Sequence, residues 1–198
     1  MNTYLEQFNN KNEISHEFFE QLRTYARINN DPIIKRDSLV LIQGLLNIID
    51  AKEMLEIGTA IGYSALSFVS AKKDLHVDTI ERNELMYQEA TKNVKMLNKQ
   101  EQVNIIYGDA LEVDNNSLKK YDVIFIDAAK AQYQKFFDKY APLLKDNGII
   151  LTDNIIFHGC VSDQENLSKN VRSMVKKIDM YNHYLNTLED YTTYYIDS

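Results

Sequence analysis

The chain has 198 residues, of which 44% are hydrophobic and 26% charged, and its formal net charge is −7. This suits one domain with a substantial core, and the acidic balance argues against a surface that binds nucleic acid throughout. A single cysteine excludes an intramolecular disulfide and a cysteine-rich zinc cluster, so we expect a reducing, cytoplasmic setting. The most apolar window, residues 39–49, is too short to span a bilayer, so we expect no membrane association.

The first quarter of the chain is predicted to be helical, because residues 14–26 and 36–49 place apolar side chains at helical spacing on either side of Pro32. Further helices are predicted at 63–70, 84–97, 132–144 and 167–184, and strands at 54–57, 75–80, 103–107, 123–126, 149–152 and 192–196. This alternation is typical of βαβ units and predicts an α/β fold with a doubly wound, mostly parallel sheet. Without a linker or repeat, residues 1–198 read as a single domain, with a helical cap over 1–50 and a core over 51–198.

Ligands in open α/β sheets bind beyond the carboxyl ends of the strands, so these ends are the first place to look for a site. The first strand runs into a turn in which Gly58 and Gly62 let the backbone approach a ligand, ahead of a helix N-terminus. The second strand ends at Glu81, 23 residues beyond Gly58, near the offset at which an acidic residue binds ribose hydroxyls. A structural turn and a helix-capping glutamate are the alternatives.

Three further strand ends carry polar residues. Asp109 follows the third strand, Asp127 the fourth, and the pair Asp153 and Asn154 the fifth. Neighbouring parallel strands lie about 4.8 Å apart, so oxygens from adjacent ends can converge on one cation, and two carboxylates with one amide suit a hard ion such as Mg²⁺. Lys130 is close enough in sequence to serve the same site. Each of these residues alone has an ordinary reading as a turn or a solvated side chain, but together they favour a metal site.

These segments resemble the cation-dependent O-methyltransferases, a group of class I S-adenosylmethionine (SAM) methyltransferases that includes catechol and caffeoyl-CoA O-methyltransferases. The likeness is carried by LEIGTAIGYSAL (55–66), TIER (79–82), YGDA (107–110), YDVIFIDAAKAQY (121–133) and GIILTDN (148–154). It implies a Rossmann-like class I SAM methyltransferase fold, SAM and Mg²⁺ or a similar divalent cation as cofactors, and a homodimer. Family members usually carry a final antiparallel strand, and the chain stops at Ser198 without it, so we expect a core short of that strand.

The resemblance also implies roles for individual residues. SAM would be bound by residues from several loops and strand ends, namely Ile34, Glu56, Gly58, Ser64, Glu81, Asp109, Ala110 and Asp127. Mg²⁺ would be held by Asp127, Asp153 and Asn154, with Lys130 as the general base. The chemistry is consistent, because a chelated cation lowers the pKa of the hydroxyl to be methylated and a lysine can then take its proton.

The identity of the acceptor rests on a finer resemblance. The entry segment DPIIKRDSLVLIQGLL (31–46) is similar to that of bacterial tRNA 5-hydroxyuridine methyltransferases, which implies formation of 5-methoxyuridine at the wobble position. An anticodon loop would need a local basic surface, for which the candidates are Lys35, Arg36, Lys169, Arg172 and Lys176. The alternatives are a small catechol-like or caffeoyl-CoA-like acceptor and, from another class, a non-catalytic SAM- or nucleotide-binding module.

Overall fold

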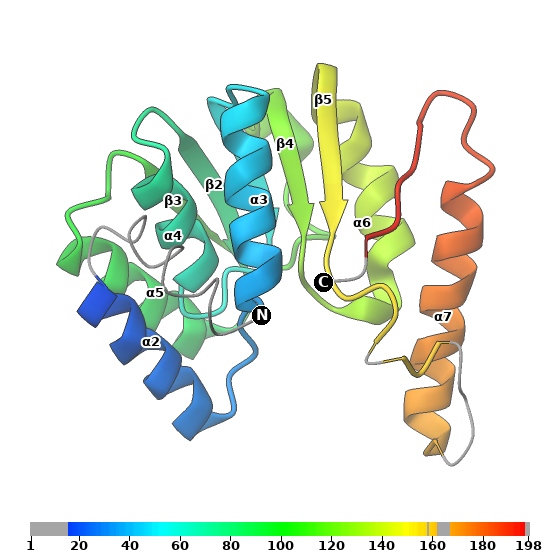
Figure 1. Cartoon of the computed structure of the whole chain (residues 1–198), viewed down its shortest axis with the longest axis horizontal. Helices are drawn as coiled ribbons and strands as arrows, with labels where there is room; N and C mark the ends of the chain where they lie inside the picture. The colour runs from blue at the N-terminus through cyan, green and yellow to red at the C-terminus, as the bar shows by residue number, and fades with distance from the viewer. Residues whose placement is uncertain (1–15, 158, 162–166, 197–198) are drawn as a thin grey trace.

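Within residues 16–157, 159–161 and 167–196, which this computed structural model describes, a five-stranded parallel sheet forms the centre of the fold (Figure 1). Its order is β3-β2-β1-β4-β5, with β1 Glu53–Ile57, β2 His76–Glu81, β3 Val103–Tyr107, β4 Tyr121–Ile126 and β5 Leu144–Thr152. The α-helices are α2 His16–Asn29, α3 Arg36–Ile48, α4 Tyr63–Ala71, α5 Glu84–Met96, α6 Tyr133–Tyr140 and α7 Lys169–Leu185. Short 3₁₀ turns lie at η2 Asn115–Ser117, η3 Lys130–Gln132 and η4 Ala141–Leu143.

Helices cover both faces of the sheet, which gives two hydrophobic cores. One core joins α2, α3, α4 and α5 to the face of the sheet that carries Met54, Val77 and Phe125. The other joins α6 and α7 to the face that carries Leu55, Ile80 and Ile124. Because side chains alternate along a strand, neighbouring residues of β1 enter different cores. This arrangement confirms the predicted doubly wound α/β architecture.

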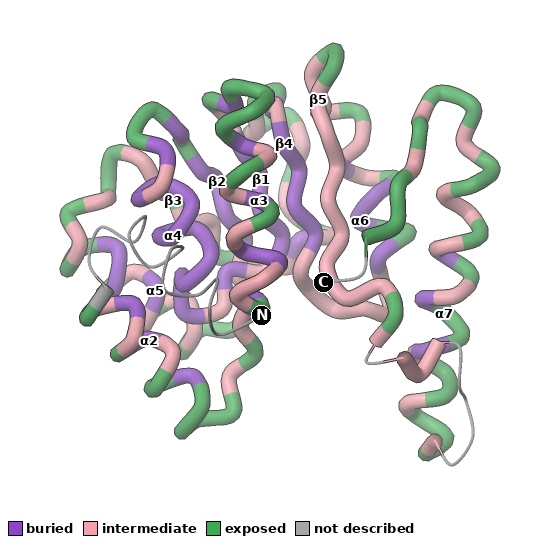
Figure 2. Tube along the Cα trace, viewed as in Figure 1, coloured by how far each residue is buried: buried purple, intermediate pink, exposed green. Residues whose placement is uncertain are grey.

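The helices before β1 cover α4, a short and mostly apolar helix whose residues are buried around its circumference. Every residue of α4 from Tyr63 to Ser70 is buried, and both α2 and α3 pack against this helix (Figure 2). A mostly apolar helix that is buried on all sides needs packing partners on all sides. Residues 16–48 thus contribute two helices that cover α4, and the first 15 residues of the predicted cap lie outside the described part of the chain.

The boundaries around α6 and β5 differ from the sequence-based expectation. The helix predicted over residues 132–144 ends at Tyr140 and passes into η4, where Pro142 cannot supply the N–H that would continue an α-helix. Strand β5 then begins at Leu144 instead of residue 149, because Leu144 pairs with Tyr121 ahead of a register shift in the β4–β5 ladder. The polar residues before Ile149 conceal this early start in the sequence.

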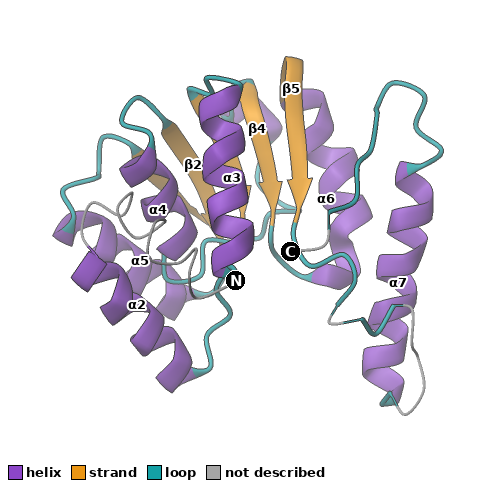
Figure 3. Ribbon diagram, in the orientation of Figure 1, coloured by secondary structure: helices purple, strands orange, loops and turns teal. Residues whose placement is uncertain are grey.

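The prediction of a strand over residues 192–196 is wrong. In the described residues this segment is an extended loop that follows α7, and β5 pairs only with β4 (Figure 3). A strand requires a partner for its backbone groups, and no antiparallel strand is present among the described residues to join this segment to the β5 edge. In the same described part of the chain, no helix is both long and apolar enough to cross a bilayer.

Candidate active site

The residues that follow the strands continue the backbone ladder of the sheet, which fixes their positions at its carboxyl edge. The Gly58 amide donates to the Ile80 carbonyl at 3.1 Å, and the Asp127 amide donates to the Ile57 carbonyl at 3.0 Å. The Asp153 amide likewise donates to the Ile126 carbonyl at 3.1 Å. The predicted strand-end residues are therefore held side by side along one edge, as the parallel topology requires.

Gly58 is the residue that lets β1 turn into α4 beside the end of β4. Its φ is +104°, and a Cβ added there would lie 2.2 Å from the Asp127 carbonyl oxygen. Only glycine combines this backbone conformation with so close an approach. Gly62, with φ +83°, directly precedes α4 and has no side chain to cap the first N–H groups of that helix. These N–H groups make the start of α4 suited to a ligand carboxylate.

Glu81, at the end of β2, holds the glycine turn from the neighbouring strand. Its carboxylate accepts the Ala60 amide at 2.9 Å through Oε2 and the Asn83 amide at 2.7 Å through Oε1. At the next strand end, Asp109 accepts the Leu111 amide at 2.9 Å and lies 3.6 Å from the Arg82 guanidinium. Glu81 and Asp109 are thus fixed next to each other at one end of the site.

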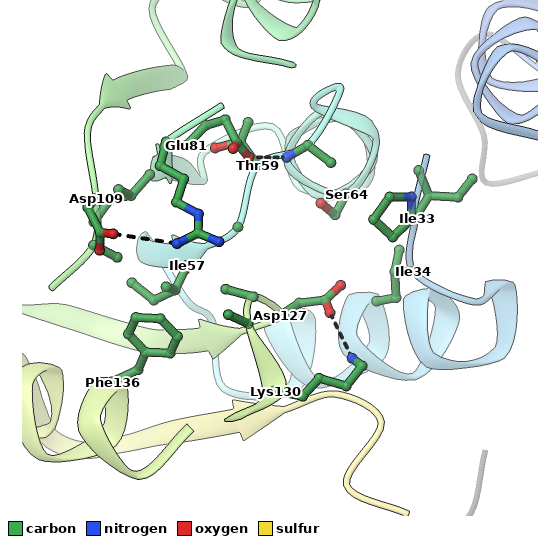
Figure 4. A pocket seen from close by; sticks show the side chains of 18 of the residues that line it. Ile33, Ile34, Ile57, Thr59, Ser64, Glu81, Asp109, Asp127, Lys130 and Phe136 are labelled. Carbon is green, nitrogen blue, oxygen red and sulfur yellow. Dashed lines mark hydrogen bonds and ion pairs between the residues drawn. The ribbon is translucent and has the colours of Figure 1, made fainter. Parts of the chain in front are cut away.

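A cavity of about 440 Å³ opens above these strand ends and collects most of the predicted cofactor-binding residues (Figure 4). The figure shows Glu81 and Asp109 on one side and Asp127 with Lys130 on another. From the predicted set, Ile34, Gly58, Ser64, Glu81, Asp109, Ala110, Asp127 and Lys130 line it. A volume of this size is in the usual range for a small-molecule site.

Asp127 and Lys130 form a second charged side of this cavity, apart from Glu81 and Asp109. Lys130 Nζ lies 3.9 Å from Asp127 Oδ1 and donates a hydrogen bond of 3.1 Å to the Tyr133 hydroxyl. Burial, followed by the negative charge of Asp153, raises the pKa of the Asp127 carboxyl to about 6, and the positive charge of Lys130 opposes this rise. Asp127 and Asp153 are therefore close enough to repel each other, and Lys130 compensates only part of this charge.

Asp153 and Asn154 line a smaller neighbouring cavity of about 150 Å³, between α3 and the end of β5. Asn154 has a left-handed backbone with φ +60°, a conformation that asparagine tolerates better than most residues. No group of three or more His, Cys, Asp or Glu side chains in the described residues is arranged to hold a metal. The predicted magnesium ligands Asp127, Asp153 and Asn154 comprise two carboxylates and one amide, so they do not form a group of three such side chains.

The profile of the O-methyltransferase family matches residues 9–188. The chain belongs to the O-methyltransferase family. Tapetum-specific methyltransferase 1 from Arabidopsis thaliana is 30% identical over 160 residues, which cover 76% of this chain and 69% of that protein. A crystal structure of a Staphylococcus aureus protein, provisionally named a caffeoyl-CoA O-methyltransferase, has a TM-score of 0.89 and 48% identity, and the match covers 96% of this chain and 90% of that one.

The fold likeness extends to more distant members. An O-methyltransferase from Bacillus cereus, solved in complex with SAH, has a TM-score of 0.78 at 24% identity, with 94% of this chain and 87% of that chain covered. That likeness is evidence for the fold, and it confirms the Rossmann-like class I SAM methyltransferase architecture. The protein is a SAM-dependent O-methyltransferase, so the alternative of a non-catalytic binding module is set aside.

Glu56 of this O-methyltransferase was expected to contact the cofactor, but the structure places it outside the main cavity. Its side chain is completely buried in β1 and does not line the cavity. Parallel register places Glu56 opposite Thr79 of β2, and the Thr79 hydroxyl donates to Glu56 Oε2 at 2.6 Å. The Thr79 hydroxyl also lies 2.6 Å from the hydroxyl of Thr59, in the glycine turn. Glu56 therefore lies beneath the turn and supports it through two threonines.

Burial raises the pKa of the Glu56 carboxyl to about 8, although hydrogen bonds from Ser64 and Thr79 oppose the rise. Between about pH 4.5 and 8 the folded protein therefore binds a proton that the unfolded chain releases. By linkage, this group makes stability fall as pH rises through that interval, by up to about 5 kcal/mol.

We expect Glu56→Gln to remove this pH dependence. Measured by thermal melting in EDTA, the stability of the variant relative to the wild-type enzyme should increase from pH 5 to pH 8, because glutamine cannot ionise. The exposed Glu84, changed to glutamine, is the matched control and should show no such trend. Parallel wild-type and Glu56→Gln curves over this range would contradict the assignment of a neutral, buried Glu56.

Two apolar wall residues of the enzyme were not predicted. Phe157, in the turn after β5, and Met174, on α7, both line the main cavity. Phe157 has φ +43°, which is rare for a residue with a large side chain and often marks a functional segment. Neither residue belongs to a recognisable motif. Their segments reach the cavity through tertiary packing, which the local sequence does not reveal.

The predicted basic residues on α7 lie away from the core of the enzyme. Lys169, Arg172 and Lys176 are exposed, whereas the buried residues of α7 are Val175, Ile178 and Tyr181. At about 100° per residue, these two sets fall on opposite sides of the helix. Lys35 is exposed and lines the smaller cavity, and Arg36 is half-buried at the start of α3.

Proposed function

We propose that this enzyme transfers the methyl group of SAM to one of two adjacent oxygens of its acceptor, with the help of a divalent cation. The observation that carries the proposal is the juxtaposition of Lys130 and Asp127 on the wall of the main cavity, 3.9 Å apart, with Asp153 near enough to perturb Asp127. A base, a potential metal ligand and a cofactor-sized cavity are thus combined at one edge of the sheet.

The main cavity fits SAM, which supplies an electrophilic methyl group when bound. Glu81 has lone pairs left on both carboxylate oxygens and would accept from the ribose hydroxyls. Gly58 and Ser64, at the start of α4, would bind the methionine portion, and Asp109 and Ala110 would lie beside adenine. Buried Ile34, from the segment before α3, would cover the ligand.

The carboxylates suit a divalent cation, which as a Lewis acid would lower the pKa of an acceptor hydroxyl. Asp127, Asp153 and Asn154 would hold it, because carboxylate and amide oxygens are the ligands that Mg²⁺ prefers. The raised pKa of Asp127, caused by burial and then by the charge of Asp153, supports this reading, since Lys130 offsets only one of the two negative charges and a cation would neutralise the remainder.

The remaining chemistry belongs to residues of the chain. Lys130 takes the proton from the acceptor hydroxyl, and the walls of the cavity hold the acceptor oxygen in line with the methyl group, where alignment supplies much of the rate. Phe157, Met174 and Ile33 provide apolar surface on the acceptor side and exclude water from the reacting groups.

A small acceptor of the caffeoyl-CoA type is the first candidate. Its two neighbouring hydroxyls offer the adjacent oxygens that the proposed cation site needs, and flat aromatic rings pack well against Phe157 and Met174. The Staphylococcus aureus relative carries the name of such an enzyme. A caffeoyl-CoA O-methyltransferase from Populus kitakamiensis, 29% identical over 126 residues, does so as well.

The second candidate is 5-hydroxyuridine at the wobble position of tRNA, whose 5-hydroxyl and 4-carbonyl also offer two adjacent oxygens. It is favoured by the exposed Lys169, Arg172 and Lys176, since α7 extends beyond the carboxyl ends of β4 and β5 (Figure 1). An RNA backbone that follows this edge would meet the basic side of α7. However, the basic residues lie on the side of α7 opposite to Met174, the α7 residue that lines the main cavity. This makes tRNA the weaker candidate.

Methyl transfer from labelled SAM tests both candidates. We expect transfer to caffeoyl-CoA or a simple catechol, complete loss of turnover in EDTA, and recovery on addition of Mg²⁺. In parallel, tRNA from cells that lack the 5-methoxyuridine modification is offered as acceptor. Transfer to this tRNA alone would overturn the first candidate and establish the second. Turnover that is unchanged in EDTA would contradict the role of the cation.

A further inference from the structure

Tyr133 lies between the two strand ends that carry the proposed catalytic residues. It is the first residue of α6 and only 1% exposed. Its hydroxyl donates to the Asp153 backbone carbonyl at 2.7 Å and accepts from Lys130 Nζ at 3.1 Å. One buried hydroxyl therefore connects the turn after β4, which carries Lys130, to the residue that follows β5.

The direction of these hydrogen bonds is determined by the number of protons available. A phenol has one proton, and the Asp153 carbonyl can only accept, so the Tyr133 hydroxyl must donate there. Toward Lys130 the same oxygen can only accept. A lysine amine carries N–H groups whether or not it is protonated, so this hydrogen bond can persist in both states of a general base.

The ring of Tyr133 is itself fixed by packing. It meets the ring of Tyr181 from α7 with centroids 5.7 Å apart, and the Tyr181 hydroxyl lies 3.0 Å from the Thr152 hydroxyl at the end of β5. Lys130 Nζ also lies 5.7 Å from the centre of the Tyr133 ring. A rigid aromatic layer thus supports the hydroxyl, while the flexible Lys130 side chain depends on this contact and on Asp127 for its orientation.

We propose, on the basis of the function proposed above, that Tyr133 is a positioning residue that keeps the amine of Lys130 directed at the main cavity beside Asp127. With one N–H engaged by Tyr133, the rest of the amine faces Asp127 and the cavity wall. Loss of the hydroxyl leaves Lys130 free to rotate among several rotamers, and misplacement of a reacting group by about 1 Å can cost up to about a hundredfold in rate.

The test is Tyr133→Phe, with Tyr181→Phe as the matched control. Both variants lose a hydroxyl from the same aromatic layer, but only the first loses a contact with Lys130. We expect Tyr133→Phe to lower kcat about tenfold with KM for the acceptor nearly unchanged, whereas Tyr181→Phe should keep the wild-type kcat. Melting temperatures of both variants report the structural cost separately. Wild-type kcat in Tyr133→Phe, or an equal loss in both variants, would overturn the proposal.

A second measurement does not depend on turnover. Acetic anhydride labels lysine amines, and peptide mass spectrometry reports the rate at Lys130 relative to the exposed Lys92. We expect Lys130 to react about fivefold faster in Tyr133→Phe than in the wild-type enzyme, because a hydrogen bond no longer restrains it, and to be unchanged in Tyr181→Phe. If the wild-type protein transfers no methyl group to the acceptors offered, yet Lys130 is labelled faster in Tyr133→Phe than in wild type, the proposed function is refuted and the positioning role is supported. Unchanged labelling would overturn that role.

Discussion

Replacement of Gly58 by alanine is expected to destabilise the protein by about 3 kcal/mol or more, and to abolish SAM binding in whatever fraction still folds. The added Cβ would lie 2.2 Å from the Asp127 carbonyl oxygen and 2.9 Å from its carbonyl carbon. Both are backbone atoms at the end of a central strand, so neither can move without disturbing the β1–β4 ladder. The φ of +104° adds strain for any residue with a side chain.

Gly44→Ala is the matched control for this substitution. Gly44 is an exposed residue inside α3, and an added Cβ meets nothing within 4 Å. Alanine should therefore stabilise the helix by about 0.5 to 1 kcal/mol. Chemical denaturation of both variants and calorimetric titration with SAM measure the contrast. Equal stabilities for the two variants, with SAM still bound, would show that the β1–α4 turn tolerates a side chain and would contradict this account.

Asp127→Asn is expected to lower kcat/KM by about a thousandfold, equivalent to about 4 kcal/mol of transition-state stabilisation. Asparagine keeps the size of the side chain but removes the charge that would hold the cation and pair with Lys130. The stability of the metal-free protein should not fall at pH 8. Burial and Asp153 raise the pKa of Asp127 to about 6, so the ionised carboxyl weakens the metal-free fold above that pH and the neutral amide does not.

The control is Asp122→Asn at the opposite end of the same strand. Asp122 accepts the backbone amides of Lys52 and Glu53, each at 2.9 Å, and pairs with Lys145 at 3.0 Å. Its loss of charge should lower stability by about 1 kcal/mol and leave kcat/KM of the folded protein unchanged. Methyl-transfer rates at several Mg²⁺ concentrations distinguish the two variants. Near wild-type turnover in Asp127→Asn would contradict the proposed site.

The sheet could be predicted from the sequence because buried parallel strands are nearly continuous apolar runs. Strands β1 to β4 appear close to their expected positions for this reason. The errors have local physical causes. Strand β5 begins earlier than expected, among polar residues at its exposed end, and residues 192–196 have a strand-like composition without a strand partner in the described structure. Composition reports the tendency to be extended, whereas a strand also needs a neighbour.

The site was predictable to the extent that it lies on strand ends. Gly58, Glu81, Asp109 and Asp127 come together because parallel strands bring their carboxyl ends to one edge, a property of the topology itself. Phe157 and Met174 reach the same cavity from a turn and a later helix. Their distance from the glycine turn along the chain leaves no local pattern that would reveal them.

For this protein the sequence by itself determined the fold class, the glycine turn and the edge of the sheet at which the main cavity opens, because each follows from local periodicity and from residues next to strand ends. Only the tertiary structure decided that Glu56 supports the turn from below and that the Tyr133 hydroxyl joins Lys130 to the end of β5. Both depend on which side chains meet across neighbouring strands and helices. That is set by register and packing between segments distant in the chain.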